Sequence, residues 1–175
     1  MGNSQTYFQG YRENYYLGLQ GVSIGGKSLT LPSNVSTIDI KGNGGTVIDS
    51  GTTYTLFPQE VSDQIAAEFA SQIAYPSVKG RVEGYGPCYN VSGVANANIK
   101  FPEFAFHFGG SSDMVLPQGN VFMQVKSDIY CSTFQGYNDD VPNGPAVILG
   151  SYQLRNLYIL YDREMNRLGF TQQAC

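Results

Sequence analysis

Charged residues are scarce in this chain. They make up 14% of its 175 residues, against roughly 25% in an average soluble protein. Only 10 residues are Lys or Arg, and they form no basic cluster, so the sequence argues against a nucleic-acid interface. No apolar run approaches the ~18–20 residues that cross a bilayer. We therefore expect neither a nucleic-acid partner nor a membrane span.

Histidine and clustered metal ligands are also scarce. The single histidine, His107, alternates with Phe106 and Phe108, so we expect it on the surface of a strand. A Ser-His-Asp triad is not expected because no serine lies in a Gly-x-Ser-x-Gly elbow. A zinc site is not expected because Cys and His do not cluster, and residues 42–45 lack the Gly-Lys-Ser/Thr of a phosphate loop. The sequence therefore implies no metal and no organic cofactor.

The cysteines are few and odd in number: Cys88, Cys131 and Cys175. In a secreted protein, a cysteine left over indicates a partner outside the chain. Asn34 and Asn90 begin Asn-x-Ser sequons and are glycosylation candidates. Together these features favour an oxidising compartment, and we expect a secreted protein, extracellular or vacuolar.

The first residues carry little information about the fold. The N-terminus has no positively charged start followed by an apolar core, so it is unlike a signal peptide. Residues 6–10 resemble the remnant of an expression tag, and we set residues 1–12 aside as a flexible or tag-like segment. Residues 13–175 are expected to form one domain. Within it, Asp139 and Asp140 are expected in a solvated loop.

Abundant tyrosine (13), phenylalanine (10) and glycine (21) favour many short strands joined by tight turns. One helix is expected at residues 58–73, where Val61, Ile65, Phe69 and Ile73 recur on one face. Alternating or short apolar runs predict strands at residues 15–24, 28–31, 37–40, 46–48, 104–108, 114–116, 121–125, 130–134, 146–149, 157–161 and 167–171.

The sequence Asp49-Ser50-Gly51-Thr52-Thr53 directly follows an apolar strand. Gly51 lets the backbone turn sharply and bring its N–H near the carboxylate. The Ser and Thr hydroxyls can donate hydrogen bonds that orient the carboxylate and favour its ionised form. This arrangement suits acid–base chemistry, but the tripeptide alone is more typical of an ordinary turn between strands.

The surrounding pattern resembles the pepsin-like aspartic proteases. Their catalytic motif is matched by residues 47–52, and their later apolar-apolar-Gly strand by Val147–Gly150, about a hundred residues downstream. Their C-terminal hairpin is matched by residues 158–162 and 168–170. Residues 15–26, Cys88 with its neighbours and the terminal Cys175 resemble the C-terminal lobe of the plant nepenthesin-like branch.

This resemblance, which runs from about Tyr15 to Cys175, implies a fold and half of an active site. The fold is a mostly β, barrel-like lobe with a psi-shaped loop and one main helix. Asp49 is expected to be one of two catalytic carboxylates, the second coming from an N-terminal lobe of the same enzyme. Peptide or protein substrates would be hydrolysed at acidic pH, with contacts at Thr52, Thr53 and Ile148.

The resemblance also implies a cysteine pairing. It places Cys88 and Cys131 within one lobe and predicts a disulfide between them. It assigns Cys175 to a bridge with the other lobe, so no partner for it is expected in this chain.

Two alternatives use the same fold. The first is a non-catalytic, inhibitor-like binding protein. A branch of xylanase-inhibitor-like relatives shares the fold and has lost the catalytic motifs. The second is a half-enzyme that dimerises through two copies of Asp49. The catalytic residues of the missing lobe would distinguish the first from the protease, and the mass in solution would reveal the second.

Overall fold

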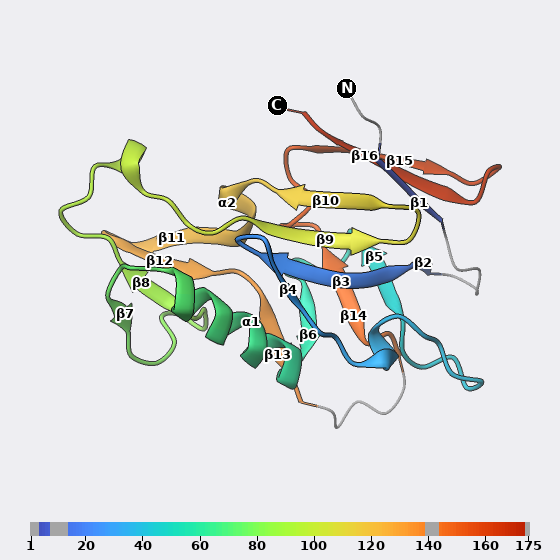
Figure 1. Ribbon diagram of the computed structural model, residues 1–175, viewed down its shortest axis with the longest axis horizontal. Helices are drawn as coiled ribbons and strands as arrows, with labels where there is room; N and C mark the ends of the chain where they lie inside the picture. Colours follow the sequence, from blue (N-terminus) through green and yellow to red (C-terminus); the bar gives the residue numbers. More distant parts are fainter. Residues whose placement is uncertain (1–3, 8–13, 139–143, 174–175) are drawn as a thin grey trace.

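Short strands dominate the fold, in agreement with the mostly β prediction. The computed structural model describes residues 4–7, 14–138 and 144–173. The strands form four sheets, and one long helix, α1 (Gln59–Gln72), packs beneath them (Figure 1). The longest helix among the described residues, at 14 residues, is too short to cross a membrane.

The sheet that carries Asp49 has the order β13-β6-β14-β5-β2. Strand β14 runs parallel to β5 and antiparallel to β6, and it lies between these two strands. The turn that joins β5 to β6 therefore passes over the end of β14, which is the predicted psi-shaped loop. The bounds of the five strands are β2 Tyr15–Leu17, β5 Thr46–Asp49, β6 Leu56–Pro58, β13 Gln135–Tyr137 and β14 Val147–Gly150.

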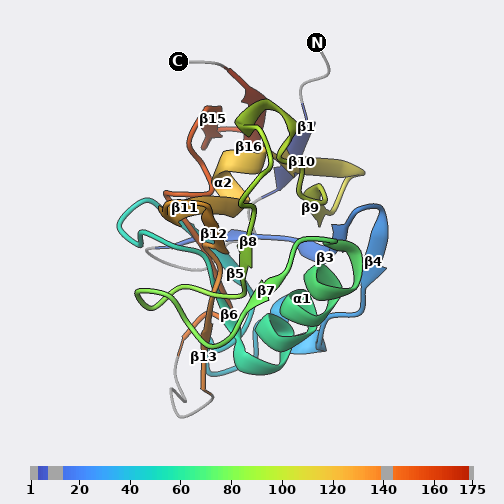
Figure 2. The same cartoon turned by 90° about the vertical axis from the view of Figure 1, so that its left-hand side faces the viewer.

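Three further sheets complete the lobe. Their orders are β10-β9-β3-β4, β11-β12-β8-β7 and β1-β16-β15. In both views of the ribbon, the β15–β16 hairpin and β1 lie at the opposite side of the molecule from α1 (Figures 1 and 2). The bounds are β3 Leu19–Ile24, β4 Lys27–Leu29, β9 Phe104–Phe108, β10 Ser112–Leu116, β7 Ser77–Val78, β8 Cys88–Asn90, β11 Phe122–Lys126, β12 Ile129–Ser132, β1 Ser4–Tyr7, β15 Leu157–Asp162 and β16 Arg167–Gln172.

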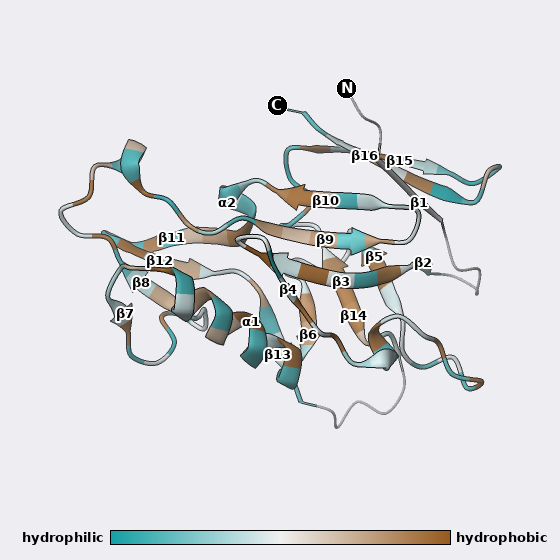
Figure 3. Ribbon diagram, viewed as in Figure 1, coloured by the Kyte–Doolittle hydropathy of each residue, from teal (hydrophilic) through white to brown (hydrophobic). Residues whose placement is uncertain are grey.

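The core is built around phenylalanine rings from different sheets. Phe104, Phe106 and Phe108 all point inward from β9 and are buried, as the alternating pattern predicts. Phe57 from β6 packs against Phe106 and against Phe134, with ring centroids 6.2 and 5.6 Å apart. Each fully buried ring contributes on the order of 1.5–3 kcal/mol, so this cluster ties the Asp49 sheet to its neighbours. Figure 3 shows the same division, with hydrophobic colour on β14 and polar colour on the outer turns of α1.

The helix prediction is confirmed. Helix α1 spans Gln59–Gln72, and Val61, Ile65 and Phe69 are buried on its inner face. Glu68 on α1 forms a salt bridge with Lys27 on β4, which fastens the helix to the second sheet. A short second helix, α2 (Gln118–Val121), and 3₁₀ turns at Ser33–Val35 and Asn96–Asn98 were not predicted.

Two strand predictions were wrong for identifiable reasons. The predicted strand 15–24 is divided at Gly18 into β2 and β3, which belong to different sheets; the Gly18 carbonyl accepts a bond from Gly109 N at 2.9 Å. The predicted strand 37–40 is a turn, because the Asp39 carboxylate accepts bonds from the Lys41 and Asn43 N–H groups, both at 2.8 Å. A side chain that satisfies its own backbone competes with the sheet ladder.

Part of the segment set aside at the N-terminus forms a strand. Its residues Ser4–Tyr7 form β1, which pairs antiparallel with the outer edge of β16. A sheet edge presents unpaired backbone N–H and C=O groups, and a segment of strand-forming residues can satisfy them. The other residues of that segment, 1–3 and 8–12, and the acidic pair Asp139–Asp140 lie outside the described residues.

The predicted Cys88–Cys131 disulfide is present and joins facing residues of β8 and β12. It closes a loop of sequence separation 43. Cys175 lies outside the described residues, and its assignment stays a prediction.

Removing this bridge should destabilise the lobe. In a Cys175→Ser background, Cys88→Ala with Cys131→Ala should lower the free energy of unfolding by about 4 kcal/mol in the chain-entropy account. Urea unfolding followed by circular dichroism measures the difference. Reductant should lower the stability of the Cys175→Ser parent by a similar amount and leave the double variant unchanged; equal stability of parent and variant would contradict the prediction.

Candidate active site

Asp49 is the last residue of β5, and its carboxylate is held by the turn that follows. Gly51 N–H donates to Oδ1 at 2.8 Å, and the Thr52 hydroxyl donates to Oδ2 at 2.7 Å. Each carboxylate oxygen thus has a fixed donor, as the motif predicts. These two donors, the Thr52 hydroxyl first, hold the pKa of Asp49 below its ordinary value. The side chain is exposed in this chain, so burial opposes that shift only weakly.

Gly150 on β14 fixes the position of the turn. It faces Asp49 in the parallel register of β5 and β14. A Cβ atom at residue 150 would come within 2.6 Å of the Tyr54 carbonyl carbon and 2.9 Å of the Thr52 oxygen. These are backbone atoms that cannot swing aside, so the close passage of β14 under the turn requires glycine.

Two backbone hydrogen bonds continue this contact beyond Gly150. Ser151 N donates to the Thr52 oxygen and Tyr152 N donates to the Thr53 oxygen, both at 2.8 Å. The turn after Asp49 is therefore attached along its length to the segment that follows β14, and its shape depends on a contact about a hundred residues away in sequence.

The predicted substrate contacts lie near Asp49 in different ways. Thr53 is exposed beside the carboxylate turn, whereas the Thr52 hydroxyl is already used on Asp49. Ile148 is partly buried on β14, opposite Val47, two residues before Gly150. Their roles toward substrate stay predictions.

Two exposed tyrosines lie near the Asp49 carboxylate. Tyr15 and Tyr161 contact each other, with ring centroids 4.9 Å apart. The pKa of Tyr161 is raised by partial burial first, then by the neighbouring Tyr15, and by the negative charge of Asp49. Tyr158 and Leu160 are exposed on the other side of β15, because successive side chains of a strand alternate between its two faces. We call Tyr158 and Leu160 the hairpin face.

Sequence reasoning missed a tyrosine cluster next to the turn. The Tyr54 and Tyr85 hydroxyls are 2.8 Å apart, and the Tyr54 ring also packs against Tyr152. Arg155 lies over the Tyr152 ring at 3.5 Å. The hydrogen bond shared with the Tyr85 hydroxyl raises the pKa of Tyr54 to about 12, so the Tyr54 hydroxyl stays protonated across the physiological range. Tyrosines scattered over about a hundred residues give no motif by which to find such a cluster.

His107 lies on the strand surface, as predicted, but it is not isolated. Its ring nitrogens contact the Asp113 carboxylate at 2.7 Å and the Ser23 hydroxyl at 2.8 Å. A Ser-His-Asp contact chain therefore exists without the elbow motif. Ser23 lies in β3, which has β4 and β9 on its two sides, so the sheet uses the backbone N–H groups that an oxyanion would need. We interpret the chain of bonds as a clamp across β3, β9 and β10.

The two glycosylation candidates differ in their surroundings. Asn34 is exposed in the 3₁₀ turn Ser33–Val35. Asn90 is partly buried at the end of β8, and its side-chain oxygen accepts a bond from Ser92 N at 2.8 Å. The structure thus favours Asn34 as the more accessible acceptor.

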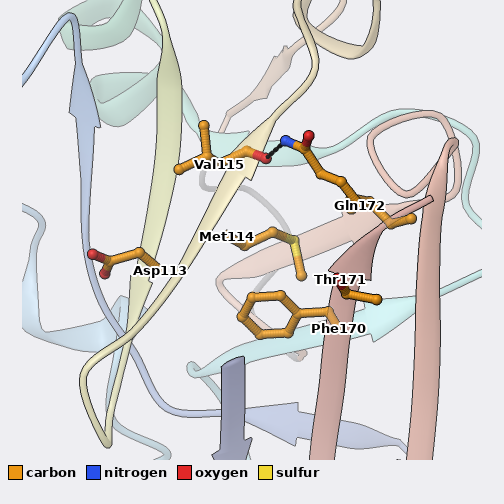
Figure 4. A pocket seen from close by; sticks show the side chains of 7 residues that line it. Asp113, Met114, Val115, Phe170, Thr171 and Gln172 are labelled. Atoms are coloured by element: carbon orange, nitrogen blue, oxygen red, sulfur yellow. Dashed lines mark hydrogen bonds between the residues drawn. The ribbon is translucent and has the colours of Figure 1, made fainter. Parts of the chain in front are cut away.

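A cavity of about 250 Å³ lies between β10 and the β15–β16 hairpin. In Figure 4, Met114 points toward Phe170, while the Asp113 carboxylate points away from that ring. Gln172 closes one side by donating to the Val115 oxygen at 3.2 Å. None of the lining residues comes from the Asp49 turn, and the described residues contain no group of three or more metal-ligating side chains.

The psi-shaped loop, the aspartate at its turn and the glycine beneath it define a lobe of the pepsin type. The chain belongs to the xylanase inhibitor C-terminal family, which it matches over residues 14–172. It resembles the C-terminal part of plant aspartic proteases of the nepenthesin-like branch.

The curated relatives include plant proteases. A probable aspartyl protease of Arabidopsis thaliana is 33% identical over 92% of this chain and 35% of the relative. Aspartic proteinase nepenthesin-1 of Nepenthes gracilis is 32% identical over 92% of this chain and 36% of the relative. This chain spans about a third of the length of these relatives.

Solved structures show the same fold. The crystal structure of edgp superimposes with a TM-score of 0.84 at 16% identity, covering 98% of this chain and 45% of that protein. Basic 7S globulin from soybean superimposes with a TM-score of 0.76 at 19% identity, covering 97% of this chain and 42% of that protein. At these identities the comparison establishes the architecture alone.

The close passage of β14 leads to a stability prediction. Gly150→Ala should destabilise the lobe by about 1–3 kcal/mol or more, because the added methyl group overlaps backbone atoms. Gly119→Ala is a matched control: nothing lies within 4 Å of a Cβ at that position in α2, and alanine favours helix. Urea unfolding should separate the two variants; equal stability would contradict the packing argument.

The hydrogen bond from Thr52 leads to a titration prediction. Thr52→Val should raise the pKa of Asp49 toward its ordinary value of ~3.9, because the hydroxyl donor to Oδ2 is lost. The lowered pKa stabilises the folded chain above the unfolded pKa, and this stabilisation disappears as the pH falls through the folded pKa. Carbon-13 NMR of the Asp49 carboxyl measures the shift.

Thr53→Val is the control for this titration, since Thr53 is the adjacent exposed threonine and donates to neither Asp49 oxygen. It should leave the Asp49 titration unchanged. A Thr52→Val midpoint equal to that of the parent would show that the hydroxyl does not set the pKa.

Proposed function

We propose that this chain is the C-terminal half of an aspartic endopeptidase that hydrolyses peptide bonds at acidic pH. The observation that supports this most strongly is the complete Asp49-Ser50-Gly51-Thr52 turn on a psi-shaped loop. Both carboxylate oxygens have donors, at 2.8 and 2.7 Å, that favour the ionised form. A carboxylate held in one plane with a lowered pKa keeps its charge in acid, where such an enzyme needs it.

The second carboxylate would come from the N-terminal lobe. Two carboxyl groups at one water cannot both ionise easily, so one carries a proton and the other is charged. The charged group takes a proton from water, whose oxygen attacks the peptide carbonyl carbon. The neutral group gives its proton to the carbonyl oxygen, forming a tetrahedral diol. The diol then expels the amine, which is protonated as it leaves, while a carboxyl group accepts the diol proton.

The hairpin face supports the N-terminal lobe as a partner. Tyr158 and Leu160 are 54% and 51% exposed on β15. Among the described residues, β15 pairs only with β16, so its other edge is available. An apolar surface beside an edge strand is typical of a protein interface. Tyr161, the next residue of β15, is close enough to Asp49 for the carboxylate charge to act on its pKa, so a lobe bound along this strand would bring its own carboxylate near the same site.

Peptide or protein chains are the proposed substrates, and Thr52, Thr53 and Ile148 the proposed contacts. Thr53 has the most accessible position of the three. We further propose a secreted protein, extracellular or vacuolar. The Cys88–Cys131 disulfide supports this, because disulfides persist in oxidising compartments.

An inhibitor-like binding protein is the second candidate. It is favoured by the match to a family described as xylanase inhibitor C-terminal. The intact Asp49 turn argues for the protease. The missing lobe distinguishes the candidates, because a second Asp-Thr/Ser-Gly turn there is required for the proposed chemistry and is dispensable for binding.

Asp49 should be necessary but insufficient for proteolysis. The two-lobed protein should cleave a denatured protein substrate near pH 3–5, whereas this chain alone should not, because it lacks the second carboxylate. Asp49→Asn should lower the rate by several orders of magnitude and preserve the fold, as loss of one member of a catalytic unit does. The measurement is the initial cleavage rate by peptide release.

Asp63→Asn provides the matched control, since it makes the same chemical change on the outer face of α1. It should retain parental activity. Robust cleavage by the Asp49→Asn protein would reject the aspartic protease. Activity of this chain as a dimer in solution, shown by its mass, would instead favour a half-enzyme that pairs two copies of Asp49.

A further inference from the structure

A buried polar network lies behind the Asp49 turn, and Gln153 is at its centre. Gln153 is fully buried in the segment that joins β14 to β15. Its amide makes four hydrogen bonds. The oxygen Oε1 accepts from Thr55 N and from the Thr55 hydroxyl, both at 2.8 Å. The nitrogen Nε2 donates to the Asn120 oxygen at 2.9 Å and to the Thr133 hydroxyl at 2.8 Å.

The first side of this network leads to the candidate active site. The Thr55 hydroxyl, which donates to Gln153, also accepts a bond from Gly150 N at 3.1 Å. Gly150 is the residue that faces Asp49 across β5 and β14. One side chain, Thr55, therefore links the Gln153 amide to the strand end under the carboxylate turn.

The second side of the network is an anchor. The Asn120 side chain donates back to the Gln153 backbone oxygen at 2.9 Å. The Thr133 hydroxyl lies within 3.1 Å of the Asn120 and Val121 oxygens. Gln153 is thus fixed to α2 and to the segment that precedes β13, outside the three strands of the psi-shaped loop.

The amide can adopt only one orientation. A backbone N–H such as that of Thr55 can only donate, and a backbone oxygen such as that of Asn120 can only accept. Rotating the amide by half a turn would oppose donor to donor and acceptor to acceptor. Because a buried polar group left without a partner loses its hydrogen bonds to water without replacing them, the network resists displacement of Thr55.

We infer that Gln153 is a positioning residue for the Asp49 turn and acts through Thr55 and Gly150. Its amide sets where the β5–β6 turn ends, at Thr55, relative to the end of β14, at Gly150. The carboxylate turn lies between these two points. Gln153 itself contacts no reacting atom. This inference rests on the proposed function, since a position matters for rate only if Asp49 is catalytic.

The test uses Thr55 variants of the two-lobed protein. Thr55→Val keeps the shape and the backbone N–H bond to Gln153 but removes the hydroxyl that accepts from Gly150. Its kcat should fall about 10- to 100-fold, the typical effect of a small misplacement of a catalytic group. Its KM should change by less than about twofold, because no proposed substrate contact is altered. Thr55→Ser restores the hydroxyl and should return kcat to within about threefold of the parent.

A Gln153→Glu variant adds a pH signature. Protonated glutamic acid can still accept from Thr55 and donate one bond to the Asn120 oxygen, whereas the carboxylate can donate none. The ratio of variant to parental kcat should therefore fall as the pH rises through the pKa of the new side chain. A residue that only fills space would give a constant ratio over the range where both proteins are folded by near-ultraviolet circular dichroism.

A second readout does not depend on activity. In the two-lobed Asp49→Asn protein, amide hydrogen exchange at Gly150 should speed up at least about tenfold with Thr55→Val and stay near the parental rate with Thr55→Ser. Parental kcat in Thr55→Val, or equal losses in Thr55→Val and Thr55→Ser, would overturn the inference. If the two-lobed parent cleaves nothing, the proposed function is wrong. Independently of activity, unchanged hydrogen exchange at Gly150 in the Thr55→Val variant would reject the link from Gln153 through Thr55 to Gly150.

Discussion

The passage of β14 between β5 and β6 is the constraint on which the rest of the lobe depends. It is possible only because residue 150 has no side chain: the turn after Asp49 crosses β14 with its backbone atoms closer to residue 150 than a Cβ allows. This contact holds the carboxylate turn against a strand from the far end of the chain. It also places Thr55 and the Ser151–Arg155 segment where side chains can bridge them.

The turn after Asp49 stabilises a charged carboxylate with donors from its own residues. Asp49 is exposed here, and its lowered pKa comes from the Thr52 hydroxyl and Gly51 N–H with little opposition from burial. A lobe bound along β15 would remove water from this carboxylate, which raises its pKa. The two donors would then offset part of that cost, so that one of the two carboxylates could keep its charge in acid.

Two kinds of buried interaction stabilise the interior in different ways. Phenylalanine rings from several sheets supply apolar burial, which is strong but sets no direction. The Gln153 network supplies few bonds, each with one permitted geometry. A position that must be accurate near Asp49 is therefore controlled by hydrogen bonds, while the distant parts of the lobe are held mainly by apolar packing and by the Cys88–Cys131 disulfide.

The local pattern was sufficient for several elements. The four-residue spacing of Val61, Ile65 and Phe69 predicted α1, and the alternation of Phe104, Phe106 and Phe108 predicted β9 and its buried face. Such periodicities follow from the geometry of a single helix or strand. Two strand predictions failed where a side chain or a glycine changed the local outcome, at Asp39 and at Gly18. The short strands β6, β7, β8 and β13 and the short helix α2 were not predicted.

The sequence by itself determined the mostly β class, the main helix and the candidate carboxylate with its nearest donors, because these depend on residues within a few positions of one another. The disulfide pairing of Cys88 with Cys131 was predicted from the resemblance and not from local chemistry. Only the tertiary structure decided that Gly150 lies under the Asp49 turn, that Ser23 and Asp113 meet His107, and that Gln153 reaches Thr55. Three of those contacts, Asp49–Gly150, Ser23–His107 and Thr55–Gln153, join residues 84 to 101 positions apart, whereas Asp113 reaches His107 from the adjacent strand of the β9–β10 hairpin. No local periodicity encodes which distant strands become neighbours.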